Sequence, residues 1–354
     1  MKNDQIKDRS MLNEIVQPLT DWYRQNKRIL PWRDQNNAYY TWVSEIMLQQ
    51  TRVESVKPYF QRFIGELPDV QALAECPEEK LMKLWEGLGY YNRVRNMQMA
   101  ARTVVCEYEG KLPASYEELL SLKGIGNYTA GAIASIAYQI PVPAVDGNVL
   151  RVISRITEDR QDIMKQSVRR QIEESLLEIM PEDIPGDFNQ ALIELGATVC
   201  VPNGQPLCDQ CPWDTVCKAY KEDLIDQLPV KTPKKARRIE HKTVFLLECN
   251  DQIAIHKRGD KGLLAGLWEF PNEDKKMDAE DIKEWMTAHH MEDAKVEAAG
   301  KGKHIFSHVE WHMEGVKISL KTPIESKDYV WVLKKELENT YALPSAFEIF
   351  RKIL

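Results

Sequence analysis

The chain has 354 residues, of which 43% are hydrophobic and 29% are charged, so it is long enough to form two or three domains with proper cores. Its net charge of -7 argues against a protein that binds nucleic acid through its overall charge, although basic residues gather locally in residues 231–242. No stretch approaches the roughly eighteen uninterrupted apolar residues of a membrane-spanning helix, which excludes such a span.

The chain begins with the polar stretch MKNDQIKDRS, which lacks the apolar core of a secretory signal. We therefore expect a protein of the reducing cytoplasm, where structural disulfides do not persist.

Apolar residues recur at helical spacing through the first two-thirds of the chain, which predicts an all-helical region. The pairs Thr51 with Glu54 and Ser115 with Glu118 have the spacing of capping boxes. They predict helices that start at Thr51 and at Ser115.

The glycines at 124 and 126 predict a helix–hairpin–helix. The helix from Ser115 would end at Gly124, both glycines would supply positive φ, and Asn127 would cap a second helix through Ile136. Backbone N–H groups of such a hairpin can hold a phosphate without reading sequence. From the glycines alone, an ordinary helical hairpin is an equal alternative.

An aspartate, Asp146, stands directly before another helical pattern and is predicted to be a helix N-cap. Hydrogen bonds from backbone N–H groups and the positive end of the helix would keep its carboxylate ionised. A capping aspartate is more often structural than catalytic.

Four cysteines follow within eighteen residues, in the pattern C-x7-C-x2-C-x5-C. Zinc sites commonly have two paired knuckles or include histidine, so this unsymmetrical run favours a 4Fe–4S cluster, with zinc as the alternative. The predicted ligands are Cys200, Cys208, Cys211 and Cys217.

The pattern changes after residue 240. Short β-type runs at 243–248, 253–256, 316–320 and 329–333 predict an α+β domain over residues 241–354. The basic, proline-containing stretch 229–240 is predicted to be a linker that follows the helical region 1–228.

A helix–hairpin–helix, an aspartate about twenty residues later and a four-cysteine run together resemble the DNA glycosylase superfamily that includes endonuclease III, over residues 20–225. The bifunctional members carry a nucleophilic lysine where this chain has Tyr128, and a phenol cannot form an imine. With residues 30–33 (LPWR), 44–51 (SEIMLQQT) and 87–91 (GLGYY), the chain resembles the monofunctional adenine glycosylases of the MutY family.

The resemblance implies a base-flipping enzyme of base excision repair that removes adenine mispaired with 8-oxoguanine or guanine in duplex DNA, acting as a monomer near the nucleoid. It implies an all-α glycosylase core with a six-helix module at about 31–135, and an Fe–S cluster module formed by the N-terminal segment with 136–225. Glu45 would protonate the adenine, because burial beside Val43, Ile46 and Met47 should raise its pKa.

Asp146 would stabilise the oxocarbenium-like sugar, with Tyr128 and Asn148 orienting the two acids. Gln50 and Tyr90 would enter the DNA base stack near the base opposite adenine, where the flipped adenine leaves a gap. The residues expected to contact DNA are Trp32, Arg33, Gln49, Gln50, Thr51, Leu88, Tyr90, Lys123, Gly124 and Gly126.

Residues 262–271 (GLLAGLWEFP) resemble the entry loop of a Nudix-like fold. The glutamates of the Nudix hydrolase box are missing from NEDKKMDAEDIKEW, so we expect no nucleotide hydrolysis. Phe306, Ser307 and His308 resemble the loop that recognises 8-oxoguanine. The first cysteine gap, of seven residues, and Lys123 depart from the family pattern. The alternatives are a thymine or uracil mismatch glycosylase and a non-catalytic Fe–S protein that binds DNA.

Overall fold

The computed structural model describes residues 9–33, 35–233 and 236–354. Contacts divide these residues into two compact units, one that runs to Glu75 and resumes over Arg95–Pro233, and one that joins Cys76–Val94 to the residues from 236 onward. The domain boundaries drawn from the sequence place 76–94 in the helical region instead, and they remain a proposal. Among the described residues, no helix is long and apolar enough to cross a membrane.

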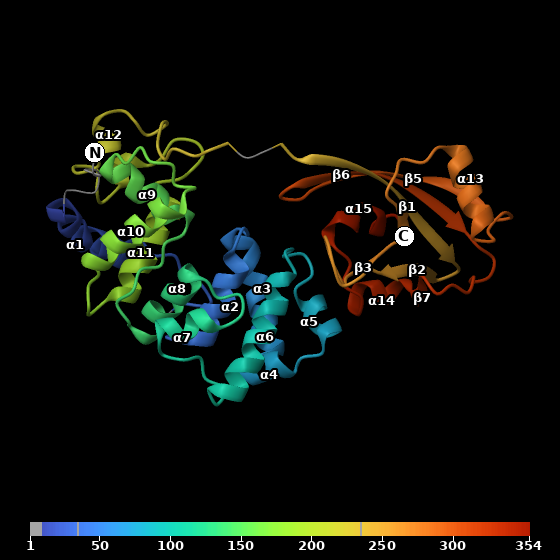
Figure 1. The fold of residues 1–354 in the computed structure, drawn as a ribbon, viewed down its shortest axis with the longest axis horizontal. Helices are drawn as coiled ribbons and strands as arrows, with labels where there is room; N and C mark the ends of the chain where they lie inside the picture. Colours follow the sequence, from blue (N-terminus) through green and yellow to red (C-terminus); the bar gives the residue numbers. More distant parts are fainter. Residues whose placement is uncertain (1–8, 34, 234–235) are drawn as a thin grey trace. The chain divides into compact units, whose positions relative to one another are not determined.

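The helical part is built from helices of different lengths joined by turns and longer loops (Figure 1). The helices of the first two-thirds are α1 Arg9–Asn26, α2 Ala38–Leu48, α3 Val53–Glu66, α4 Val70–Glu75, α5 Glu78–Leu84, α6 Asn92–Glu107, α7 Tyr116–Ser121, α8 Asn127–Tyr138, α9 Gly147–Thr157, α10 Gln166–Glu178, α11 Pro185–Thr198 and α12 Lys218–Lys221, with a 3-10 turn at Cys208–Gln210.

Two of the three helix starts predicted before residue 140 need correction. Ser115 caps α7 as predicted, since its side chain accepts a hydrogen bond from the Glu118 N–H. However, α3 begins after Arg52 with no side-chain cap, so Thr51 lies one residue outside it. Asn127 is the first residue of α8 rather than its cap, which is Gly126.

Only one of the two glycines in the hairpin turn, Gly124, adopts a positive φ. Gly124 has φ +82°, and a Cβ there would lie 2.7 Å from the Cβ of Asn96. Gly126 has φ -101°, which other residues adopt freely, so the predicted positive φ at this position is wrong.

Small residues let α8 pass through the centre of the first unit. Its buried positions are mainly Ala, Gly, Ser and Thr, and α8 packs against both α2 and α11. A Cβ at Gly131 would lie 2.2 Å from the Pro143 carbonyl oxygen, so the following chain crosses directly over this helix. This close packing brings the start of α8 to α2. A second core gathers apolar residues of α1, α9, α10 and α11 around Trp213.

The second unit contains a mixed sheet with the order β3-β2-β1-β6-β5, where β4 also pairs with β1 and β7 with β2. β1 and β6 are parallel, and the other pairs are antiparallel. The elements are β1 Arg238–Cys249, β2 Gln252–Lys257, β3 Trp268–Glu269, β4 Asn272–Glu273, α13 Ala279–Ala288, β5 Lys295–Ile305, β6 Val309–Ser319, β7 Val330–Leu333, α14 Lys334–Asn339 and α15 Glu348–Arg351, with a 3-10 turn at Ser345–Phe347.

Each face of the sheet has its own core. Met286 of α13 packs with Phe245, Leu247 and Ile318 on one face, while Phe347 and the start of α15 pack with the residues of β1, β2 and β6 on the other. The four predicted strands all exist, as parts of β1, β2, β6 and β7. β5 was not predicted, because this edge strand is largely exposed and rich in Lys, Glu and Gly.

Candidate active site

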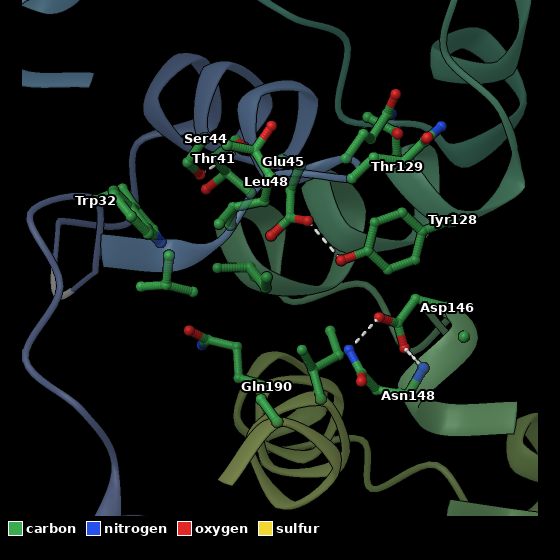
Figure 2. Close-up of a pocket in the computed structure, with 18 of the residues that line it drawn as sticks. Trp32, Thr41, Ser44, Glu45, Leu48, Tyr128, Thr129, Asp146, Asn148 and Gln190 are labelled. Carbon is green, nitrogen blue, oxygen red and sulfur yellow. Dashed lines mark hydrogen bonds between the residues drawn. The ribbon is translucent and has the colours of Figure 1, made fainter. Parts of the chain in front are cut away.

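A cleft of about 1180 Å³ opens in the first unit, between α2, α8, the start of α9 and α11. Figure 2 shows Glu45, Tyr128 and Asp146 pointing into this cavity from three different elements. Most residues predicted to act on DNA lie there. The predicted residues that line the cleft are Trp32, Arg33, Glu45, Gln49, Gln50, Thr51, Gly124, Gly126, Tyr128, Asp146 and Asn148.

Glu45 is buried on α2, with 8% of its surface exposed. The Tyr128 hydroxyl, at the start of α8, donates a hydrogen bond of 2.5 Å to its Oε2. The pKa of Glu45 is raised to about 7, mainly by burial. The Tyr128 hydrogen bond lowers this pKa, the charge of Asp146 raises it, and the charge of Arg33 lowers it. The shift has the direction that the sequence predicts. A carboxyl with this pKa can give up a proton near neutral pH.

Asp146 caps α9 as predicted. Its Oδ1 accepts hydrogen bonds from the backbone N–H groups of Asn148 and Val149, each 2.8 Å, and its Oδ2 accepts one of 2.7 Å from Asn148 Nδ2. Burial nevertheless raises the pKa of Asp146, against the effect of these hydrogen bonds and of Arg151. The sequence predicts that the cap keeps this carboxylate ionised, but it does not reveal how deeply the carboxyl is buried, and this burial is the cause of the raised pKa.

Asn148 is fixed from two further sides. Arg151 Nη2 donates to its Oδ1 at 2.9 Å, while Arg151 Nε donates to the carbonyl of Cys200 at 2.8 Å. A Cβ at Gly196 of α11 would lie 2.6 Å from the Cβ of Asn148. Because Gly196 has no side chain, α11 can pack closely against the start of α9. This packing keeps the Asn148 amide beside Asp146.

A buried glutamate that sequence reasoning missed organises one wall of the cleft. Glu194 of α11 accepts hydrogen bonds from Arg28 Nε at 2.6 Å and from Arg33 Nη2 at 2.7 Å. Burial favours a higher pKa, but these guanidinium groups outweigh it and lower the pKa of Glu194 to about 2. Arg33, predicted to contact DNA, is therefore engaged in an internal ion pair. The signal was a charged residue within the apolar run ALIELGA.

The residues predicted to contact DNA differ in exposure. Gln50 is exposed at the end of α2 with φ +61°, which projects it from a turn. Trp32 is only 8% exposed and packs edge-on against Phe60, with ring centroids 5.3 Å apart. Lys123 is exposed but does not line the cleft. Leu88, in the second unit, is 6% exposed, so its side chain is unavailable to DNA in this structure.

Four cysteines surround one small cavity in the first unit, next to α12: Cys200, Cys208, Cys211 and Cys217. Burial and, to a smaller extent, the charges of the neighbouring thiols together raise the pKa of Cys211 to about 12. Arg155 Nη1 lies 3.3 Å from the Cys200 sulfur. Four thiolates can share such a space only around a cationic group. No set of three or more His, Cys, Asp or Glu among the described residues is arranged to hold a single metal ion.

The loop predicted to recognise 8-oxoguanine is the tight turn between β5 and β6. Phe306 N–H donates to the Val309 carbonyl at 2.8 Å, and its ring lies against Trp311 with centroids 4.8 Å apart. Ser307 and His308 are exposed at the tip. The Ser307 hydroxyl lies 2.9 Å from that of Tyr90, which belongs to the same unit. The two residues are thus neighbours although 217 positions separate them.

Comparison with known proteins gives a match in each half of the chain. A family model described as HhH-GPD superfamily base excision DNA repair protein matches residues 43–178, and a NUDIX domain model matches residues 243–352.

Several similar proteins are adenine DNA glycosylases. The chain is 32% identical to that of Rattus norvegicus, over 94% of this chain and 76% of the relative. It is 33% identical to that of Homo sapiens, over 94% of this chain and 72% of the relative. It is 34% identical to one of Buchnera aphidicola, over 86% of both chains.

Solved structures match the helical part. A thermostable thymine-DNA glycosylase aligns with a TM-score of 0.53 and 24% identity, over 62% of this chain and all of that one. A non-covalent endonuclease III–DNA complex aligns with a TM-score of 0.53 and 22% identity, over 61% of this chain and 98% of that one. At these identities the likeness concerns the fold. The predicted fold class, an all-α glycosylase core followed by a Nudix-like α+β domain, is thereby confirmed.

Proposed function

The chain belongs to the adenine DNA glycosylase family, and on that premise we propose that it removes adenine mispaired with 8-oxoguanine or guanine. Excision of adenine from DNA by hydrolysis of its N-glycosidic bond, in base excision repair, is the activity of this family. We propose that duplex DNA containing the mispair is the substrate and that the enzyme works beside the chromosome in the cytoplasm. We propose that it acts as a monomer.

One observation supports the proposed chemistry above all: two carboxyls with different environments line one cleft. Adenine leaves poorly as an anion, so its departure requires a proton, and the sugar left behind develops positive charge. Glu45, with a pKa near 7, is suited to donate that proton. Asp146 has three hydrogen-bond donors that favour its charged form, whereas Glu45 has one, so Asp146 is the carboxyl that faces the cation.

We further propose that the enzyme does not cleave the DNA strand. A strand-nicking lyase needs an amine that can form an imine with the sugar. By resemblance, Tyr128 stands where the bifunctional relatives carry their nucleophilic lysine. Its hydroxyl donates a hydrogen bond to Glu45. The described residues that line the cleft include no lysine. These features favour a monofunctional glycosylase in which Tyr128 orients Glu45 and Asn148 orients Asp146.

The four cysteines would hold a 4Fe–4S cluster, which adds a fixed anchor for the surrounding loops. All four line one cavity, and their unsymmetrical C-x7-C-x2-C-x5-C spacing favours this proposal over zinc. Protein purified without oxygen should be brown and contain roughly four irons per chain. A colourless protein with one zinc would contradict the proposal, and Cys208→Ser should lower both the iron content and the solubility.

Single-turnover assays on duplexes with A opposite 8-oxoguanine, A opposite guanine and T opposite guanine test the proposed activity. We expect excision of adenine from the first two and none of thymine, with abasic strands that break only after treatment with alkali. Excision of thymine would favour the mismatch glycosylase, and binding without any excision would favour a non-catalytic Fe–S protein.

A further inference from the structure

A short helical segment packs with the sheet of the second unit, although the sequence on both sides of it belongs to the first unit. This segment is Cys76–Val94, which contains α5 and the glycine-rich turn that carries Tyr90. Glu79, Lys83 and Glu86 follow one another at spacings of four and three, so their side chains leave one face of the segment. All three contact residues beyond 250.

Lys83 binds the end of a helix. Its ammonium group donates to the carbonyls of Leu337, at 2.9 Å, and Tyr341, at 3.2 Å. These carbonyls belong to the last turn of α14 and the chain just after it, where a helix leaves its carbonyl groups without partners inside the helix. A cation at this end also interacts favourably with the helix dipole. Lys83 is itself paired with Glu86 at 2.6 Å, and both side chains are less than one-fifth exposed.

Glu86 and Glu79 contact two further parts of the same unit. Glu86 accepts a hydrogen bond of 3.0 Å from the Leu343 N–H and pairs with Arg351 at 3.3 Å. Glu79 pairs with Lys257 at 2.8 Å and accepts a hydrogen bond of 3.1 Å from Trp268 Nε1. The segment is thus held at three points, of which the contacts of Lys83 and Glu86 are the better shielded from water.

The turn that follows α5 places Tyr90 next to Ser307. Gly87 and Gly89 have φ of 95° and 69°, and Tyr90 itself has φ +48°, so the backbone reverses sharply here. Tyr90 is 48% exposed, and its hydroxyl lies 2.9 Å from the Ser307 hydroxyl. A hydrogen bond between two exposed hydroxyls is too weak to hold two loops together. The contacts of Lys83 and Glu86 are the stronger candidates for that task.

We propose that Lys83 and Glu86 are positioning residues for lesion specificity. They hold the turn that carries Tyr90 against the sheet, so that Tyr90 and Ser307 meet the oxidised base as one preformed reader. This inference rests on the proposed recognition of 8-oxoguanine. It assigns part of the specificity to a segment that precedes the Nudix-like domain by about 150 residues in the sequence.

The test removes these contacts without touching the cleft or the reader. In Lys83→Met with Glu86→Ala, we expect the ratio of single-turnover excision rates, A opposite 8-oxoguanine over A opposite guanine, to fall about tenfold. The rate on A opposite guanine should change less than about twofold, since that substrate lacks the lesion contacts. The single variant Lys83→Arg, which keeps donors for both carbonyls, should retain most of the wild-type ratio. The matched control is Lys295→Met with Glu297→Ala, an exposed ion pair elsewhere in the unit.

A double-mutant cycle separates positioning from mere stability. If Lys83 and Glu86 act through the reader, Ser307→Ala should lower the ratio in the wild-type background and add little in the double variant. An unchanged ratio, or equal losses on both substrates, would overturn the inference. Should the double variant not fold, Lys83→Met alone provides the same comparison. Absence of adenine excision by the wild-type protein would instead refute the proposed function.

Discussion

The catalytic cleft and the turn between β5 and β6 bring their functional groups together in opposite ways. In the cleft, Glu45, Tyr128 and Asp146 come from separate helices and are buried. At the turn, Phe306, Ser307 and His308 are consecutive, and the last two are exposed. Burial raises the pKa of each group in the cleft, whereas the tip of the turn leaves the Ser307 hydroxyl exposed.

This difference suits the two tasks that we propose for these sites. Proton transfer and charge stabilisation require groups removed from water, and a cleft between helices supplies that environment. Recognition of a base requires donors and acceptors that DNA can reach, and the tip of a hairpin supplies these. We therefore expect substitutions in the cleft to change the rate on every substrate. Substitutions at the turn should change the choice among substrates.

The largest effect is expected at Asp146. Asp146→Asn keeps the shape but removes the negative charge that the transition state needs, so single-turnover excision should fall by about a thousandfold or more, with mispair binding nearly unchanged. Asp278→Asn is the matched control, because Asp278 also caps a helix through two backbone N–H groups, in the exposed start of α13. A variant of Asp146 with a near wild-type rate would exclude its catalytic role.

The pH dependence of the excision rate should report the titration of Glu45. Its protonated form is the active one, so the rate should fall above pH 7, near its raised pKa of about 7. Because the Tyr128 hydrogen bond lowers this pKa, Tyr128→Phe should move the alkaline limb to higher pH while reducing the rate by about tenfold or more. An alkaline limb that stays in place would mean that a different group supplies the proton.

The smallest effect is expected at the turn. Ser307→Ala, with or without Phe306→Ala, should cost the 8-oxoguanine substrate about 1–3 kcal/mol and the guanine substrate little. Point variants are preferable to truncation of the C-terminal domain, because truncation would also remove the partners of Lys83 and Glu86. The measurement is the ratio of excision rates, with the thermal midpoint as control. Equal losses on both substrates would assign the turn to nonspecific binding.

Features that depend on neighbours in the chain were predictable from the sequence alone. The cap formed by Asp146, the helical pattern of α2 and the strands within β1 and β2 all appear where their local patterns place them. The spacing of the cysteines likewise pointed to one shared site, and all four line one cavity. Local capping signals failed where the chain had a competing turn, as at Thr51, which lies just before the start of α3.

Contacts between distant segments and the depth of burial were decided by the tertiary structure. Tyr128 meets Glu45 because the small residues of α8 permit close packing against α2, and burial then raises the pKa of both acids. Glu194 is stable in the interior only because Arg28 and Arg33 converge on it. The sequence determined which chemical groups the enzyme has. Folding determined which of them meet and which lose contact with water, because both depend on packing between residues far apart in the chain.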